Sequence, residues 1–161
     1  MKFLIDDCEV IQRLRLNEGC KLMPYHDSLG RLSIGIGRCI ETNPFTPEEL
    51  AAVGDWKKGI TTNAAYMLLR NDIKKVKKDL ECFTFFPLLN HDRQFVMIDM
   101  CFQLGIRGLK GFKKALGAIS IGNWQRAHDE ILDSKYAKQT PSRAERNALC
   151  MLNGKWSYNN V

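Results

Sequence analysis

The chain has 161 residues, 45% of them hydrophobic and 26% charged, which is ordinary for a globular protein of one domain or two closely packed lobes. It has no apolar run of about eighteen residues, and Asp6 and Asp7 interrupt the start, so we expect neither a transmembrane helix nor a cleavable export signal. The net charge of +6 favours an anionic partner, whether nucleic acid, a membrane surface or a cell wall.

The N-terminal third of the sequence predicts a helix followed by a small sheet. A partly helical apolar stripe covers residues 8–17, and Gly19 is a plausible stop. Between residues 21 and 40, apolar and small residues alternate among turn formers. This pattern predicts a small antiparallel sheet whose strands are joined by the turn Asp27-Ser28-Leu29-Gly30.

The rest of the sequence predicts helices. Thr46-Pro47-Glu48-Glu49 is a capping box with proline at the first helical position. Apolar spacings of three and four predict a long helix from about 61 to 82 and a very apolar one from about 90 to 104. Asn123 and Thr140-Pro141 mark the starts of two more helices.

This order of elements predicts an α+β fold. We expect a small N-terminal lobe with the antiparallel sheet (about 1–60), an inter-lobe helix (about 61–82) and a larger helical C-terminal lobe (about 83–161). A cleft between two such lobes is a usual place for a ligand site.

The positions of the cysteines, histidines and lysines bear on metal sites, disulfides and nucleic-acid binding. The six cysteines form no CxxC pair and the three histidines are scattered, so no metal site is predicted. We expect most cysteines to be buried thiols of a protein made in a reducing cytoplasm, with a disulfide framework as the alternative. The basic run at residues 74–78 is typical of a solvated helix face, and no nucleic-acid-binding motif accompanies it.

Two acidic residues near the start are candidates for catalysis. Glu18 ends the first predicted helix, where exposed carbonyl groups and partial burial disfavour its charged form, as a general acid requires. Asp27 follows nine residues later beside a turn, where water can keep it ionised. Such a pair suits glycoside hydrolysis. Taken alone, a Glu before a helix-ending glycine and an Asp in a turn are also routine structural features.

Four blocks of sequence resemble, in order, the T4-type phage lysozymes. The first block, residues 18–38, carries Glu-Gly, Tyr, Asp, Gly, Ser and Ile-Gly-Ile-Gly at the spacing of that family. The others are residues 100–112, residues 139–146 and Gly154-Lys155-Trp156. Because the blocks span residues 18 to 156, the resemblance covers nearly the whole chain.

The resemblance implies a lysozyme-like fold and an inverting hydrolysis that needs no metal and no cofactor. Glu18 matches the family's general acid, Asp27 its second carboxylate, and Ser33 a hydroxyl residue that helps to hold the attacking water. An inverting mechanism predicts carboxyl groups roughly 6.5–9.5 Å apart. Considered without the resemblance, Ser33 is an outward strand hydroxyl.

Residues of the C-terminal lobe match the family as well. Arg143 matches an arginine that reaches back to the catalytic Glu and ties the lobes together. Phe102 and Gln103 match positions that border the cleft, although Phe102 is equally consistent with a core residue. Tyr136 takes the place of a tryptophan, and we count it among the substrate-binding candidates.

The sequence also departs from the family pattern. Arg38 replaces a histidine whose aspartate partner matches Asp72, so we predict an Arg38–Asp72 ion pair that keeps its charge at high pH. Cys39 stands where a substrate-contacting leucine is usual, and Asp99 replaces an asparagine near the acid. Two positions that align with polar substrate contacts differ as well: Ala115 and Glu130.

Together these matches predict a muramidase that cuts the β-1,4 bond between N-acetylmuramic acid and N-acetylglucosamine in bacterial peptidoglycan. We expect a monomeric endolysin, free rather than part of a larger tail protein, with neither a nucleic-acid partner nor stable membrane association. It would accumulate in the host cytoplasm and reach the periplasmic peptidoglycan through lesions made by another protein. The alternatives are a catalytically inactive peptidoglycan-binding protein on the same scaffold and a basic nucleic-acid or membrane binder.

Overall fold

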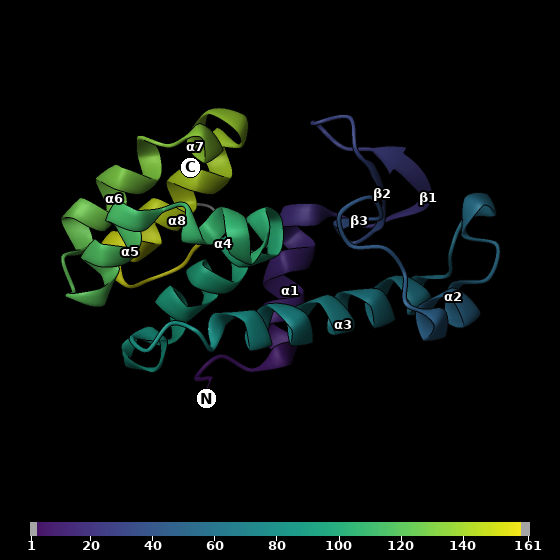
Figure 1. Ribbon diagram of the computed structural model, residues 1–161, viewed down its shortest axis with the longest axis horizontal. Helices are drawn as coiled ribbons and strands as arrows, with labels where there is room; N and C mark the ends of the chain where they lie inside the picture. The colour runs from purple at the N-terminus through teal and green to yellow at the C-terminus, as the bar shows by residue number, and fades with distance from the viewer. Residues whose placement is uncertain (1–2, 159–161) are drawn as a thin grey trace. The chain divides into compact units, whose positions relative to one another are not determined.

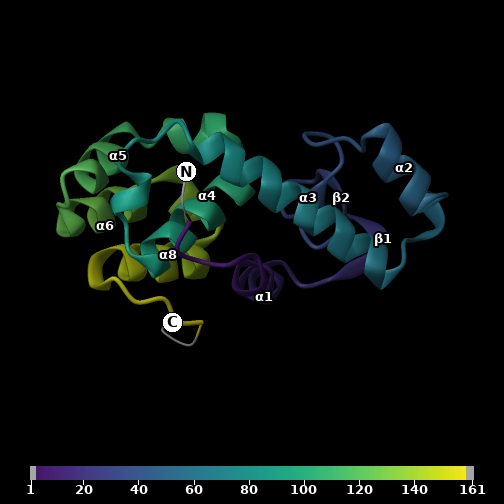
Figure 2. The same cartoon turned by 90° about the horizontal axis from the view of Figure 1, so that it is seen from below.

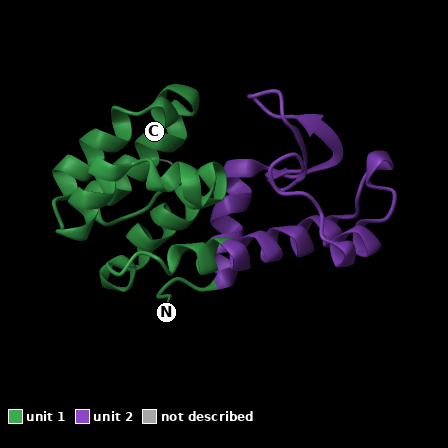
Figure 3. Cartoon of the chain, viewed as in Figure 1, with its two compact units in different colours: residues 1–6, 76–161 green, residues 7–75 purple. Residues whose placement is uncertain are grey.

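The computed structural model describes residues 3–158 and divides into two compact units (Figures 1 and 3). The N-terminal unit comprises residues 7–75, and the C-terminal unit comprises the described residues of 1–6 and 76–161. The division falls inside the long helix that was predicted to begin near residue 61, so that helix contributes residues to both units. The α+β class is confirmed, because a three-stranded antiparallel sheet is followed by a largely helical region.

The N-terminal unit contains the sheet and three helices around it. Its strands lie in the order β1-β2-β3, and all neighbours are antiparallel. The end of β2 packs against α3, because a Cβ atom on Gly35 would be in van der Waals contact, at 3.5 Å, with side-chain atoms of Ala65 and Ile60. The elements of this unit are α1 (Asp7–Glu18), β1 (Lys21–His26), β2 (Leu32–Gly35), β3 (Arg38–Cys39), α2 (Pro47–Val53), the short 3-10 helix Trp56–Lys58 and the first part of α3 (Thr62–Leu80).

The C-terminal unit is helical and is built around α4. Residues 94–101 of this helix are all buried, so neighbouring elements cover every face of it. Helices α5, α6 and α8 lie together in both views (Figures 1 and 2). The elements of this unit are the end of α3, the 3-10 helix Phe86–Leu88, α4 (His91–Lys110), α5 (Lys113–Ser120), α6 (Trp124–Leu132), α7 (Lys135–Gln139) and α8 (Pro141–Asn153).

Several helix boundaries follow their predicted signals, and one does not. Asn123 caps α6 by accepting from the backbone N–H of Arg126, and Pro141 opens α8. The apolar helix predicted to end near residue 104 continues to Lys110, although Gly105 has a non-helical backbone with φ +68°. A glycine adopts this φ without the steric cost that a side chain would bring, so the chain kinks there and resumes the helix.

The predicted burial of most cysteines is wrong. Cys8 in the first turn of α1 and Cys82 just after α3 lie toward solvent. Cys101 is inside α4, and burial raises the pKa of its thiol to about 12. Cys101 and Cys150 are buried, Cys20 and Cys39 are half-buried, and Cys8 and Cys82 are exposed.

Between residues 3 and 158, no helix has both the length and the apolar character to cross a membrane.

A buried cluster of charges stabilises the N-terminal unit around Arg38. The predicted ion pair is confirmed, with Arg38 Nε 2.8 Å from Asp72 Oδ2. Glu49, which the sequence did not link to this pair, binds the other edge of the guanidinium through two hydrogen bonds of 2.8 and 2.9 Å. The same Glu49 completes the predicted capping box of α2 by accepting from the backbone N–H of Thr46.

The cluster carries two carboxylates for one guanidinium, and two amides satisfy the remaining acceptors. Asn43 donates to Asp72 and Asn71 donates to Glu49. Arg38 and Glu49 are each 3% exposed and Asp72 is 7% exposed. Hydrogen bonds from Arg38 lower the pKa of Glu49 to about 2, whereas burial raises the pKa of Asp72. The arginine therefore favours the charge of Glu49 more than it favours that of Asp72.

Replacing Arg38 with Met is expected to lower the free energy of unfolding by about 3–5 kcal/mol, because two buried carboxylates lose their only cation in the cluster. Urea denaturation followed by circular dichroism measures the change. Lys58→Met is the matched control, since the Lys58–Asp55 pair is largely exposed and its loss should cost less than about 1 kcal/mol. Equal losses for the two variants would contradict this role of Arg38.

The pH dependence of stability should report Glu49 separately. Its pKa is about 2 in the folded protein, so its ionised form stabilises the fold above its ordinary pKa of 4.5, and that stabilisation is lost as the pH falls toward 2. Over this window wild type should lose on the order of 3 kcal/mol more than Glu49→Gln in urea denaturation. Asp72, with its raised pKa, acts in the opposite direction in both proteins. Parallel pH curves for the two proteins would refute the assignment.

Candidate active site

Glu18 is presented at the C-terminal end of α1. The helix ends because Gly19 adopts a φ of +68° and donates its N–H to the carbonyl of Arg15 at 2.9 Å. This is the usual left-handed termination, for which glycine is favoured. Glu18 is half-buried, so its carboxyl group stands partly out of water at a helix end.

The backbone of Gly37 lies directly against the side chain of Glu18. Gly37 is in the tight connection between β2 and β3, with a φ of +72°. A Cβ atom on Gly37 would be 2.8 Å from both Cδ and Oε2 of Glu18, a distance that real Cβ atoms do not tolerate. The second glycine of the Ile-Gly-Ile-Gly motif therefore makes room for the carboxyl group of Glu18.

Asp27 sits in the turn after β1 and accepts four hydrogen-bonding contacts. Its Oδ1 accepts the backbone N–H groups of Leu29 and Arg31, each at 2.9 Å. Its Oδ2 faces the side chain of Arg31, with Nε at 2.9 Å and an Nη at 2.8 Å. Partial burial opposes ionisation, but the donors from Arg31 and Leu29 prevail and hold the pKa of Asp27 below its usual value. The sequence predicted an ionised Asp27 but attributed the charge to water.

Tyr25 lies between the two acids. Burial and then the negative charges of Glu18 and Asp27 raise the pKa of its phenol, and so does the thiol of Cys39. Both carboxyl groups therefore act on one aromatic ring, whose face is also covered by Lys21 with Nζ 4.3 Å from the centroid. The predicted spacing of the two carboxyl groups stays a prediction.

Ser33 occupies the centre of the sheet beside this ring. It pairs with Tyr25 on β1 and with Cys39 on β3, so the three side chains share one face. Ser33 is 2% exposed and its Oγ donates to the carbonyl of Arg31 at 3.3 Å. Cys39 is a half-buried thiol at the edge of the row. The sheet thus places Ser33 and Cys39 on one face with Tyr25. The water-holding role of Ser33 stays a prediction.

Asp99 and Arg143 form a buried pair inside the C-terminal unit. Arg143 donates from Nε and an Nη to the two oxygens of Asp99 at 2.9 and 2.7 Å, and Asp99 is fully buried. Asn147 donates to Asp99 at 2.7 Å and to the Tyr136 hydroxyl at 2.9 Å. Burial, together with the charge of Asp99, raises the pKa of Tyr136. The predicted contact of Arg143 with Glu18 would join the two units and stays a prediction.

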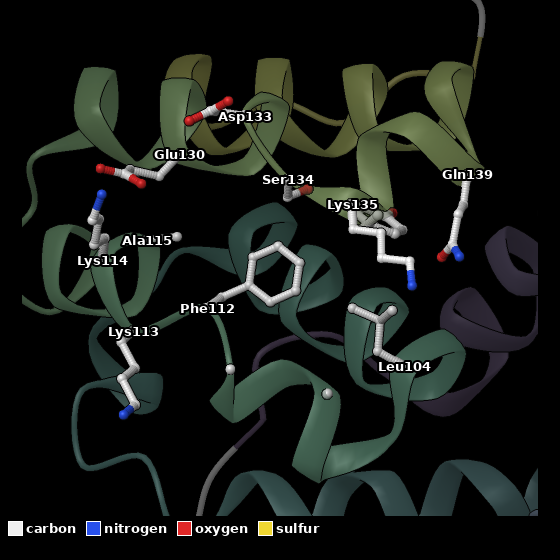
Figure 4. Close-up of a pocket in the computed structure, with 13 residues that line it drawn as sticks. Leu104, Phe112, Lys113, Lys114, Ala115, Glu130, Asp133, Ser134, Lys135 and Gln139 are labelled. Carbon is white, nitrogen blue, oxygen red and sulfur yellow. The ribbon is translucent and has the colours of Figure 1, made fainter.

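The C-terminal unit also contains a pocket of about 640 Å³ beside Tyr136 (Figure 4). Phe112 stands at its centre, and its ring meets that of Tyr136 edge-on with centroids 6.1 Å apart. Glu130 and Lys114 point toward one another at one end, and Lys135 and Gln139 lie at the other (Figure 4). The lining comprises Leu104, Gly108, Gly111, Phe112, Lys113, Lys114, Ala115, Glu130, Asp133, Ser134, Lys135, Tyr136 and Gln139.

Of the substrate-binding candidates in this unit, only Tyr136 lines the pocket. Phe102 and Gln103 lie half-buried on α4 outside its lining. Gln103 donates to the Thr140 hydroxyl at 3.4 Å, and its Oε1 is buried with no partner among the described residues. Ala115 and Glu130, which depart from the family pattern, are both in the lining.

Comparisons with known proteins identify the family of the chain. The phage lysozyme family model matches residues 15–148. The chain is 29% identical to the pre-baseplate central spike protein Gp5 of Enterobacteria phage T4, over 89% of this chain and 27% of that protein. It is 30% and 28% identical to two Dictyostelium discoideum proteins named "Probable T4-type lysozyme" 1 and 2, over 83% of this chain and 87% of each.

The chain thus spans about a quarter of the spike protein and most of each Dictyostelium protein. The family match begins before Glu18 and ends after Arg143, so it includes the acids, the sheet and the helices that carry the pocket. On this match, the chain belongs to the phage lysozyme family.

Proposed function

We propose that this protein is a muramidase that hydrolyses the β-1,4 bond between N-acetylmuramic acid and N-acetylglucosamine in peptidoglycan. The observation that carries the proposal is the placement of Glu18 against Gly37, with Asp27 held in the turn after β1 and Ser33 on the adjoining strand β2. Two carboxyl groups in different surroundings are the minimum that glycoside hydrolysis requires. Membership of the phage lysozyme family supports the substrate class.

In the proposed reaction, Glu18 donates its proton to the glycosidic oxygen while a water molecule attacks the anomeric carbon from the opposite face. The C–O bond to the leaving sugar breaks, a new C–O bond to water forms, and the configuration inverts. Asp27, held ionised by its donors, stabilises the positive charge that develops on the sugar, orients the water and takes up the proton that the water loses. Ser33 would hold the same water from the centre of the sheet.

The pocket in the C-terminal unit would bind a further part of the substrate. Tyr136 and Phe112 offer apolar surface of the kind that packs on sugar rings, and charged side chains surround it. Phe102, Gln103 and Cys39 are proposed to contact the glycan strand as well. The net charge of +6 would steer the protein toward anionic cell walls.

The biological setting is proposed separately. The endolysin role, with accumulation in the host cytoplasm and release to the periplasmic peptidoglycan by another protein, is supported by the family match. The similarity to the phage spike protein favours a second setting, in which the same chemistry serves a larger assembly. Lysis of expressing cells only when a membrane-permeabilising protein is co-expressed would favour the endolysin role.

Glu18→Gln should abolish activity while leaving the fold intact, because glutamine fills the same space but has no proton to donate. We expect clearing of purified Gram-negative cell walls to slow by about 10²–10⁴-fold, and mass spectrometry of wild-type products to show new reducing-end N-acetylmuramic acid. Glu81→Gln, at an exposed position, is the control. Equal clearing by Glu18→Gln and wild type would exclude Glu18 as the acid, and wall binding without clearing by wild type would favour an inactive binding protein.

Gly37→Ala should displace the carboxyl group of Glu18, because the new Cβ would lie 2.8 Å from it. A misplacement of about 1 Å can cost on the order of 10²-fold in rate, and we expect a loss of that size in wall clearing. Gly30→Ala is the matched control, since Gly30 has a similar φ of +76° but no atom within 4 Å of the added Cβ. Both variants carry the same backbone strain, so equal losses of activity would show that contact with Glu18 is not the cause.

A further inference from the structure

Arg31 is the only side chain among the described residues that is seen to bind Asp27. Two of its nitrogens lie on one oxygen, Oδ2, while the other oxygen is held by backbone N–H groups of the turn. The turn thus holds one oxygen of Asp27, and Arg31 is the described side chain that holds the other.

The surroundings of Arg31 are acidic. Its pKa is raised first by its hydrogen bond to Asp27, and also by the charges of Cys39 and Glu41. Glu41 is itself fixed by accepting the backbone N–H of Leu32 at 2.8 Å. Arg31 is thus held at the rim of the sheet between Asp27 and Glu41, and about a third of its side chain is exposed, at 36%.

We propose that Arg31 is a positioning residue for the reaction, which keeps Asp27 ionised and oriented and so extends activity into acid. The proposal rests on the proposed muramidase function. Two donors from one planar guanidinium fix the direction of Oδ2 as well as its charge. Among the groups that act on the charge of Asp27 within the N-terminal unit, Arg31 is the charged one, and it acts both through its hydrogen bonds and through its positive charge.

The direct test is the titration of Asp27 by carbon NMR of side-chain carboxyl groups, with Asp27→Asn to identify the signal. In Arg31→Met the midpoint should rise by about one pH unit or more, because a neighbouring arginine commonly lowers an aspartate pKa by that amount. In Arg31→Lys the midpoint should lie between those of wild type and Arg31→Met, since lysine keeps the positive charge but lacks the two parallel donors of the guanidinium. Arg15→Met is the charge-matched control, because Arg15 lies in the same unit and donates to the exposed Tyr66 hydroxyl instead. An unchanged Asp27 midpoint in Arg31→Met would overturn the proposal.

The second test is the pH profile of kcat/KM on peptide-free glycan fragments. The acid limb reports the group that must be ionised, so it should move to higher pH in Arg31→Met, in step with the NMR midpoint, and return part of the way in Arg31→Lys. A limb that stays in place while the NMR midpoint moves would also overturn the proposal. If wild type cleaves no glycan, the proposed muramidase function is refuted. The effect of Arg31 on the ionisation of Asp27 is decided separately, by the NMR titration.

Discussion

Gly37 and Arg38 are adjacent, and together they decide where the sheet meets the end of α1. Gly37 allows the connection between β2 and β3 to lie against the carboxyl group of Glu18, which a Cβ atom at this position would displace. Arg38, one residue later, makes five hydrogen bonds to α2, α3 and the loop between β3 and α2. The contact between Gly37 and Glu18 can serve catalysis only if the backbone around it stays in place. The strand β3 has two residues, and the buried ion pairs of Arg38 fix its position.

The carboxyl groups of the N-terminal unit lie in contrasting surroundings. Glu49 and Asp72 are buried and share one arginine, so their charges serve the fold. Asp27 lies in the turn after β1, where hydrogen bonds hold its pKa below the usual value, whereas Glu18 lies at a helix end against the backbone of Gly37. In the proposed reaction, these different neighbours would keep the two carboxyl groups in separate roles.

Much of this arrangement was predictable because its signals are local. The capping box at Thr46, the cap at Asn123 and the proline that opens α8 each depend on residues within one turn. The sheet and its turn followed from alternation over residues 21–40. Helices α5 and α7 escaped prediction, because α5 has no side-chain cap and α7 has five residues. The Arg38–Asp72 pair was found only through the family resemblance.

What the sequence could not show was which residues serve two purposes. Glu49 satisfied a capping rule, and nothing in its spacing indicated that it also binds Arg38. Asp27 and Arg31 are four apart across a turn, a common spacing with no catalytic meaning of its own. The double use of Glu49 has a consequence for substitutions in this unit. A change at Glu49 removes a contact at the start of α2 and two of the hydrogen bonds that anchor Arg38. The beginning of α2 and the position of β3 are therefore energetically coupled through one side chain.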